Sequence, residues 1–269
     1  MVRAIERIEQ DITMLKEAIR AIATELHSIY VSYLTILGAA LQKQLILAVY
    51  HLCTQGYSDN FLQLSLNQRQ QLQQGIRKLG QKAAVQLLDY LKAEEVEKSE
   101  AVEELDDNPE SEIQNPKYLD PSNPIELVQW HEDIEEAIQD TLKKVSHDTN
   151  FLIQKAGILP KKLPEPILAA AAAASEASAE VIPGPPNLLN LVIEIGNEEE
   201  PEDSSVTQLI TINLRLGEIE FADTTLLSGR KQIRNILVQL NKVGREYQKK
   251  QRELKISEAE AAWRASWFE

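Results

Sequence analysis

Cysteine, glycine and aromatic residues are all scarce in this sequence. Its single cysteine, Cys53, cannot form an intramolecular disulfide and excludes a zinc site built from several cysteines. Aromatic residues make up only 5% of the 269 residues and glycine is sparse, which disfavours sandwiches and barrels. Leu, Ile, Ala, Glu, Gln and Lys are abundant instead. Because these residues are typical of long helices, the composition predicts an all-α fold, either a coiled coil or a helical bundle.

Long uninterrupted apolar runs are also missing. The N-terminus alternates isoleucines with charged residues, unlike a secretory signal. Polar residues interrupt the apolar stretch 29–52 before it reaches the roughly 18 residues of a membrane span. There is no P-loop, dinucleotide fingerprint or nucleophile elbow. We therefore expect a cytoplasmic protein that is not an enzyme and that uses no cofactor.

Only four histidines are available as metal ligands: His27, His51, His131 and His147. None belongs to a His–carboxylate pair that is repeated on a second helix, as a di-iron bundle requires. The nearest approach is His131 with Glu132, Glu135 and Glu136. We expect these side chains to form a solvated acidic face rather than a metal site, because charged residues are mostly exposed. A bundle enzyme that uses His131 is the rival hypothesis, and it would require a bound metal.

Apolar residues recur alternately three and four positions apart through the N-terminal segment. This seam consists of Ile5, Ile8, Ile12, Leu15, Ile19, Ile22 and Leu26, and it continues beyond them. The spacing is typical of a left-handed coiled coil. The positions between are largely charged up to about Glu25, so the first half of the helix should project as an arm for oligomerisation or partner binding. The second half is apolar on several faces and should enter a bundle.

Isoleucine at both seam positions of the heptad favours assemblies larger than dimers. Tyr33 and Ala40, which continue the seam, weaken this inference. An antiparallel partner helix within the same chain would void it.

The rest of the chain divides into helices and linkers. Ser65 and Gln68 form a capping box that starts a second helix, which ends near Lys92 and closes a first region, 1–92. An acidic linker, 93–122, precedes a third helix over 123–159, which the pair Asn123-Pro124 begins. A Pro/Ala-rich and acidic linker, 160–204, follows. Both linkers are predicted to be disordered.

A short apolar segment, 187–195, lies inside the second linker. It can be a strand or a docking motif, with Leu188, Leu189 and Leu191 as its contact residues. A long C-terminal helix is predicted over 205–269, although residues 206–219 also fit the alternation of a strand. Pattern alone does not decide between the two.

The C-terminal helix combines positive charge with aromatic residues. Residues 230–255 carry nine basic and two acidic side chains, a net charge of +7, and Arg245, Lys249 and Arg252 are the candidate polyanion contacts. The net charge of the whole chain is −14, which argues against both nucleic acid and an anionic membrane as partners, and the basic helix can instead neutralise the acidic linkers or face water. Trp263, Trp267 and Phe268 are possible docking residues, with packing inside the same fold preferred over packing on a partner.

Several stretches resemble a conserved cyanobacterial protein family to which no activity is attached. They are Gln44–Tyr57, Ala156–Pro166, Gly184–Leu191, Glu218–Asp223 and Arg245–Leu254 with the tail Trp263–Phe268. The resemblance covers nearly the whole chain and implies a cyanobacterial cytoplasm. From the residues themselves we expect a non-enzymatic assembly or adaptor protein, which binds itself or another protein. The alternative is a regulator that binds nucleic acid or an anionic membrane through the basic helix.

Overall fold

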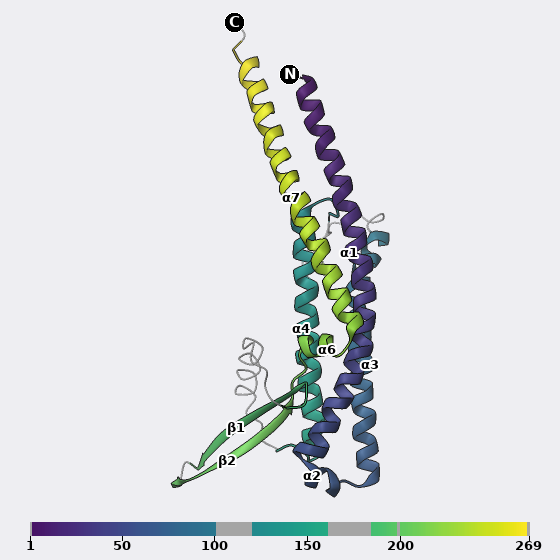
Figure 1. Cartoon of the computed structure of the whole chain (residues 1–269), viewed down its shortest axis with the longest axis vertical. Coiled ribbons are helices and arrows are strands. Elements are labelled where there is room, and N and C mark those ends of the chain that lie inside the picture. Colours follow the sequence, from purple (N-terminus) through teal and green to yellow (C-terminus); the bar gives the residue numbers. More distant parts are fainter. Residues whose placement is uncertain (1, 101–119, 161–183, 198–199, 268–269) are drawn as a thin grey trace, which may run out of the picture. The chain divides into compact units, whose positions relative to one another are not determined.

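The computed structural model describes the backbone of residues 2–100, 120–160, 184–197 and 200–267. This part of the chain contains six α-helices, a short π-helix and a single two-stranded antiparallel sheet. The prediction of an all-α fold is therefore confirmed, with one strand pair added to it (Figure 1).

The chain divides into two compact units. Unit 1 comprises Met1–Tyr33, Tyr90–Glu136 and Ser228–Glu269, and unit 2 comprises Leu34–Asp89 and Ala137–Leu227. Three long helices contribute to both units: α1 (Val2–His51), α3 (Leu66–Glu100) and α4 (Pro124–Lys155). The helix α7 (Thr224–Ala265) lies almost entirely in unit 1.

In unit 1, α7 runs antiparallel to the first half of α1 (Figure 1). Lys250 forms an ion pair with Asp11 at 3.1 Å, and Gly229 lies against the ring of Tyr33, so residue numbers fall along one helix as they rise along the other. The N-terminal half of α4 completes the apolar core. Its buried residues are Ile12, Ile19, Ile22 and Leu26 of α1, Leu127, Trp130 and Ile134 of α4, and Ile233, Ile236 and Leu240 of α7.

The prediction that the first half of α1 projects as a free arm is therefore wrong. Its seam is covered by helices of the same chain: Ile19 and Leu26 are fully buried, and Ile5, Ile8 and Leu15 are half-buried. The partner is antiparallel and intramolecular, which voids the inference of an assembly larger than a dimer.

In unit 2, the second half of α1 packs closely against α3 (Leu66–Glu100). A side chain on Gly38 would place its Cβ 2.9 Å from Cβ of Ala84, and one on Gly80 would lie 3.1 Å from Cγ of Gln42. Position 38 therefore requires glycine, because the backbone of α1 lies so close to Ala84 of α3 that no methyl group fits between them. The two pairs also show that α1 and α3 are antiparallel here.

The predicted start signals of the helices are confirmed. The backbone N–H of Ser65 donates to Oε1 of Gln68 at 2.8 Å, and the N–H of Gln68 donates to Oγ of Ser65 at 3.4 Å, which is the capping box. The N–H of Ile125 donates to Oδ1 of Asn123 at 3.1 Å at the start of α4. The predicted end of the second helix, near Lys92, is wrong, because α3 continues to Glu100 through residues that were predicted to form the acidic linker. Residues 101–119 of that predicted linker lie outside the described residues.

The stop signals are glycines, as predicted. α1 passes into the π-helix η1 (Leu52–Gly56), which ends at Gly56, and a short helix α2 (Ser58–Gln63) follows. α4 ends at Lys155, and Gly157 then takes a φ of 84°, a left-handed conformation that favours glycine.

The segment 187–195 is a strand. β1 (Leu188–Asn197) pairs antiparallel with β2 (Glu200–Ile212), with Leu188 opposite Ile212. A short helix α6 (Leu216–Phe221) then precedes α7. The prediction of one helix over 205–269 is wrong for its first part, because the strand alternation of its apolar residues prevails there. Residues 161–183 of the second predicted linker lie outside the described residues.

The stretch Ile5–Gly56 meets the length and composition test for crossing a membrane. It contains an 18-residue window with a mean hydropathy of 1.4, although polar residues interrupt it, and half of that window is buried inside the protein. The interrupted apolar run therefore does not by itself exclude a span. Core helices of soluble proteins pass the same test, and burial is what packing against α3 and α4 requires of this helix.

Candidate functional site: a buried polar cluster and an exposed basic helix face

A cluster of five polar side chains lies in the interior of unit 1. α1 contributes Tyr30 and Tyr33, α4 contributes His131 and Glu135, and α7 contributes Arg230. The hydroxyl of Tyr30 donates to Oε1 of Glu135 at 2.7 Å. Arg230 donates from Nη1 to the same oxygen at 2.6 Å and from Nη2 to the hydroxyl of Tyr33 at 2.7 Å. The cluster therefore joins three helices through one carboxylate.

Helical spacing brings these side chains together. Residues three or four positions apart lie on one helix face, which applies to Tyr30 and Tyr33 and to His131 and Glu135. Tyr30 also contacts the indole of Trp130 edge-on, with ring centroids 5.4 Å apart. The sequence pattern alone did not reveal the cluster, because its partners lie about a hundred residues or more apart.

The hydrogen bonds fix the tautomer of His131. The single proton of the Tyr30 hydroxyl is donated to Glu135, so the hydroxyl oxygen accepts from Nδ1 of His131, with which it is in contact. A neutral imidazole with its proton on Nδ1 keeps Nε2 as an acceptor.

Burial sets the electrostatics of the cluster. It raises the pKa of Tyr30 above its ordinary value, and the negative charge of Glu135 raises it further. Burial also lowers the pKa of His131, although Glu135 opposes this shift. The charge of Glu135 is balanced by Arg230, whose guanidinium carbon lies 4.8 Å from the ring centroid of Tyr33. The arrangement is that of a mutually satisfied network that holds three helices together.

The predicted solvated acidic face on α4 is only partly correct. Glu132 and Glu136 are exposed, whereas His131 and Glu135 are half-buried members of the polar cluster. Among the residues that the structure describes, no three His, Cys, Asp or Glu side chains are grouped so that they could hold a metal ion.

Unit 2 attaches its hairpin to the helices through side chains. Along the outer edge of β2 and just beyond it, backbone N–H groups donate to Tyr57 (from Ile210, 3.0 Å), to Oδ1 of Asn150 (from Ile212, 2.9 Å) and to Oγ of Ser146 (from Leu214, 2.9 Å). The amide of Asn150 also donates to the carbonyl of Ile212 at 2.9 Å. These side chains take the place of a third strand.

Asn187 connects the start of β1 to three other segments. Its φ of 62° is left-handed, which asparagine tolerates, and the side chain is fully buried. Its Oδ1 accepts from the N–H of Arg215 at 3.0 Å, its backbone N–H donates to Glu218, and its amide donates to Gln44 at 3.3 Å. The left-handed turn is a signal that no apolar pattern contains, so sequence analysis did not find this residue.

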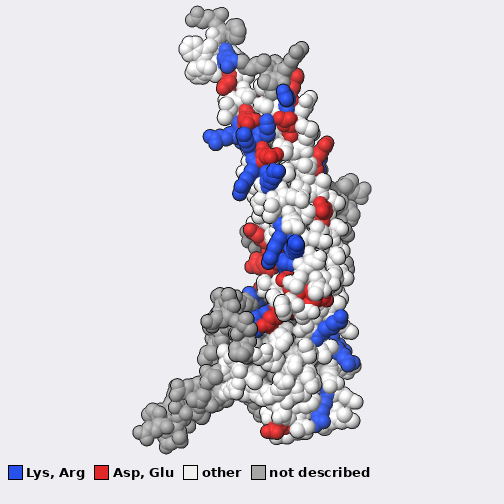
Figure 2. Space-filling view, in the orientation of Figure 1, with Lys and Arg blue, Asp and Glu red and all other residues white. Residues whose placement is uncertain are grey.

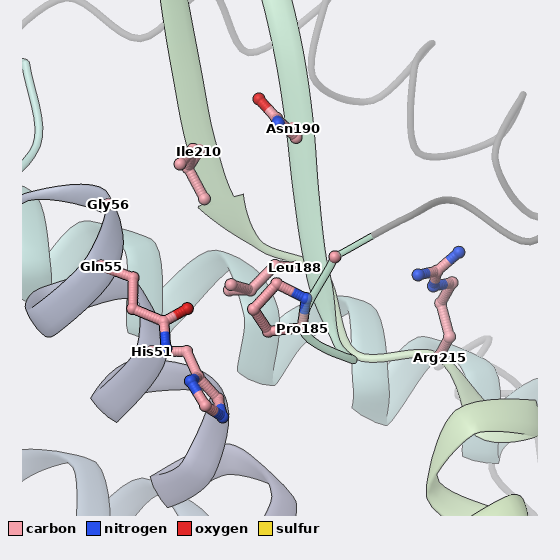
Figure 3. A pocket seen from close by; sticks show the side chains of 9 residues that line it. His51, Gln55, Gly56, Pro185, Leu188, Asn190, Ile210 and Arg215 are labelled. Atoms are coloured by element: carbon pink, nitrogen blue, oxygen red, sulfur yellow. The ribbon is translucent and has the colours of Figure 1, made fainter.

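The predicted docking residues of β1 face the interior of the chain. Leu188 and Leu189 are buried and Leu191 is half-buried, so the interpretation of this segment as a free docking motif is wrong. Leu188 instead lines a cavity of about 100 Å³ beside His51, Gln55 and Ile210 (Figure 3). That volume holds on the order of three water molecules and lies well below the roughly 300 Å³ at which ligand pockets begin.

The outward face of α7 carries a row of cations. Lys242, Arg245, Lys249 and Arg252 are all exposed, and the described residues contain no ion pair to any of them. Figure 2 shows Lys and Arg side chains gathered over α7. The three predicted polyanion contacts thus lie on one exposed surface, to which Lys242 is added.

The row of cations continues into apolar residues towards the end of α7. Ile256, Trp263 and Trp267 are 50%, 65% and 72% exposed, and the two indole centroids are 5.7 Å apart. The expectation that the tryptophans pack inside the same fold is therefore wrong for both rings. Phe268 lies outside the described residues. We call the seven exposed residues the α7 face: Lys242, Arg245, Lys249, Arg252, Ile256, Trp263 and Trp267.

The negative charge of the chain is concentrated in two segments. Residues 94–112 contain ten acidic side chains and one basic, and residues 194–203 contain six acidic and none basic. Together they account for fifteen net negative charges against −14 for the whole chain, so all other residues sum to +1. The overall charge therefore does not describe the surroundings of α7, and it does not exclude an anionic partner there.

Comparison with protein-family models, with curated proteins and with solved structures finds no match to this chain, so the cyanobacterial resemblance stays a prediction.

Proposed function

We propose that the protein is a non-enzymatic helical adaptor and that the α7 face is the surface through which it binds. The observation that carries this proposal is the combination of four exposed cations and the exposed Trp263 on one side of α7, with the exposed Trp267 two residues beyond the end of the helix. Exposed tryptophan rings are costly in water and are enriched where proteins meet partners.

The opposite side of α7 supports the proposal by holding the helix in place. Ile233, Ile236 and Leu240 are buried, Arg230 is anchored in the polar cluster, and Lys250 pairs with Asp11. A helix fixed along one side presents its other side as a preformed surface, which reduces the entropy lost on binding.

The proposal differs from the sequence-based one in its surface. The heptad seam of α1 was expected to bind, but four of its residues (Ile12, Ile19, Ile22 and Leu26) are buried within the chain. Self-association through that seam would require α7 to leave it. The α7 face needs no such rearrangement.

Photocrosslinking in the native cell tests this surface. A photoreactive amino acid replaces the exposed Gln248, which borders the α7 face, so that all four cations are retained; the exposed Gln81 of α3 is the matched control position. We expect irradiation to yield a discrete adduct from position 248 and only background from position 81. Equal labelling at both positions, or none at 248, would refute the proposal. The mass of the adduct shows whether the partner is a protein or a lipid.

A further inference from the structure

We infer that the α7 face binds the surface of an anionic phospholipid bilayer. This inference rests on the proposed function, and it adds the chemical class of the partner. It depends on two properties that occur together on this face: an excess of positive charge, and apolar side chains that belong at a membrane interface.

The seven residues form one continuous stripe. Lys242, Arg245, Lys249 and Arg252 are three or four positions apart, and Ile256 and Trp263 continue at intervals of four and seven; Trp267 follows four positions later, in the turn just beyond the end of α7. Such spacings keep side chains on one side of a helix. At 1.5 Å per residue the stripe is about 40 Å long.

Glu246 is exposed beside Arg245, and two further carboxylates, Glu253 and Glu260, lie near the stripe. Glu253 accepts from Lys250 at 3.1 Å, and Glu260 lies 3.6 Å from Arg264, so both are paired with cations that are not part of the stripe. The cations of the stripe have no such partner among the described residues. Anionic lipid headgroups therefore meet a surface with an excess of positive charge, since residues 242–256 carry six basic and two acidic side chains.

The apolar end of the stripe distinguishes a bilayer from a nucleic acid. Indole rings are enriched at the membrane–water interface, where the ring is buried and its N–H stays hydrated. Ile256 is aliphatic and half-exposed, so it gains from burial among acyl chains, whereas it cannot stack on a base. Basic residues on the polar side with Trp and aliphatic residues beside them are the pattern of helices that lie in the interface.

Cosedimentation of the full chain with lipid vesicles tests the inference. We expect binding to vesicles of equal parts phosphatidylserine and phosphatidylcholine, none to phosphatidylcholine alone, and weakening with added salt. A variant carrying Lys242→Gln, Arg245→Gln, Lys249→Gln and Arg252→Gln should bind at least about 100-fold more weakly, because each cation near such a surface contributes roughly five-fold.

A charge-matched variant serves as the control. It carries Arg77→Gln, Lys78→Gln, Lys82→Gln and Lys144→Gln, four exposed cations in unit 2, and should bind like the native chain. Tryptophan emission should shift to shorter wavelength on binding, and the Trp263→Ser/Trp267→Ser variant should lose the shift. Trp130 is buried and serves in all variants as the sign that unit 1 is folded.

Four outcomes would overturn the inference. They are equal binding to both kinds of vesicle, equal loss in the variant and its control, binding to DNA without binding to vesicles, and vesicle binding that appears only after the acidic residues of 94–112 are neutralised. In the last case the occupant is the chain's own acidic segment. A protein adduct from position 248 without vesicle binding would overturn the lipid inference but leave the adaptor proposal standing, whereas the absence of any adduct and any vesicle binding would overturn both.

Discussion

The substitution Glu135→Ala, which removes the carboxylate of the polar cluster, should lower the free energy of unfolding of unit 1 by about 2–3 kcal/mol. A buried ion pair that loses one partner costs roughly 3–5 kcal/mol. The cost here is placed lower because the side chain of Glu135 is 25% exposed, Arg230 still donates to Tyr33, and the hydroxyl oxygen of Tyr30 still accepts from His131. Glu135→Gln retains an acceptor for Tyr30 and should cost about 1 kcal/mol, the worth of the lost charge.

Urea unfolding followed by tryptophan fluorescence measures this effect. In a Trp263→Phe/Trp267→Phe background Trp130 is the only tryptophan, and it lies against Tyr30 inside the cluster. The control is Glu132→Ala, which removes an exposed carboxylate from the same helix and should cost less than about 0.5 kcal/mol. Equal midpoints for Glu135→Ala and Glu132→Ala would refute the reasoning, because the cluster would then not hold the three helices together.

Three further predictions concern the rest of the molecule. Burial lowers the pKa of His131 below its value in the unfolded chain, so the contribution of the neutral imidazole to stability is complete above about pH 6.5 and is lost as the pH falls towards the folded-state pKa. Urea unfolding midpoints should therefore decrease between neutral and mildly acidic pH, and His131→Asn should reduce this pH dependence. Burial raises the pKa of Cys53 to about 11, so an aromatic disulfide reagent at neutral pH should leave it unmodified until unit 2 unfolds, and rapid modification of the native protein would contradict the structure. Gly38→Ala should destabilise unit 2 by about 1–3 kcal/mol through its clash with α3, whereas Gly217→Ala meets nothing within 4 Å and should be neutral or stabilising; thermal midpoints in the reverse order would contradict the close approach of the helices.

Local signals in the sequence predicted those helix boundaries that a cap or a glycine marks, whereas the end of α3 and the start of α7 were misplaced. The Ser65 capping box, the Asn123 cap and the stops at Gly56 and Gly157 are all present, because caps depend on residues within one turn of each other. The heptad seam likewise identified buried residues of α1. It did not identify what covers them, since one apolar stripe suits a second copy and an intrachain helix equally.

The apolar pattern of the sequence could not predict which side chains pair with one another across long stretches of the chain. The hairpin depends on hydrogen bonds from its backbone to Ser146 and Asn150, which lie about sixty residues away and have no apolar periodicity. The polar cluster similarly combines Tyr30 with Glu135, separated by 105 residues. On the α7 face, the basic residues and the tryptophans were both recognised, but net charge was taken as a property of the whole chain. Its confinement to two acidic segments is what permits an anionic partner at α7.

Cysteine protection in the native cell tests most directly whether the α7 face is a binding surface. Asn241→Cys places a thiol beside the row of cations, and Gln81→Cys places one on the exposed side of α3, while the native Cys53 is buried and stays silent. In the purified protein both introduced thiols should react with a maleimide at similar rates. In the cell, the thiol at position 241 should be protected and the thiol at position 81 labelled. Equal labelling of both positions in the cell would contradict the proposal that the α7 face is occupied by a partner.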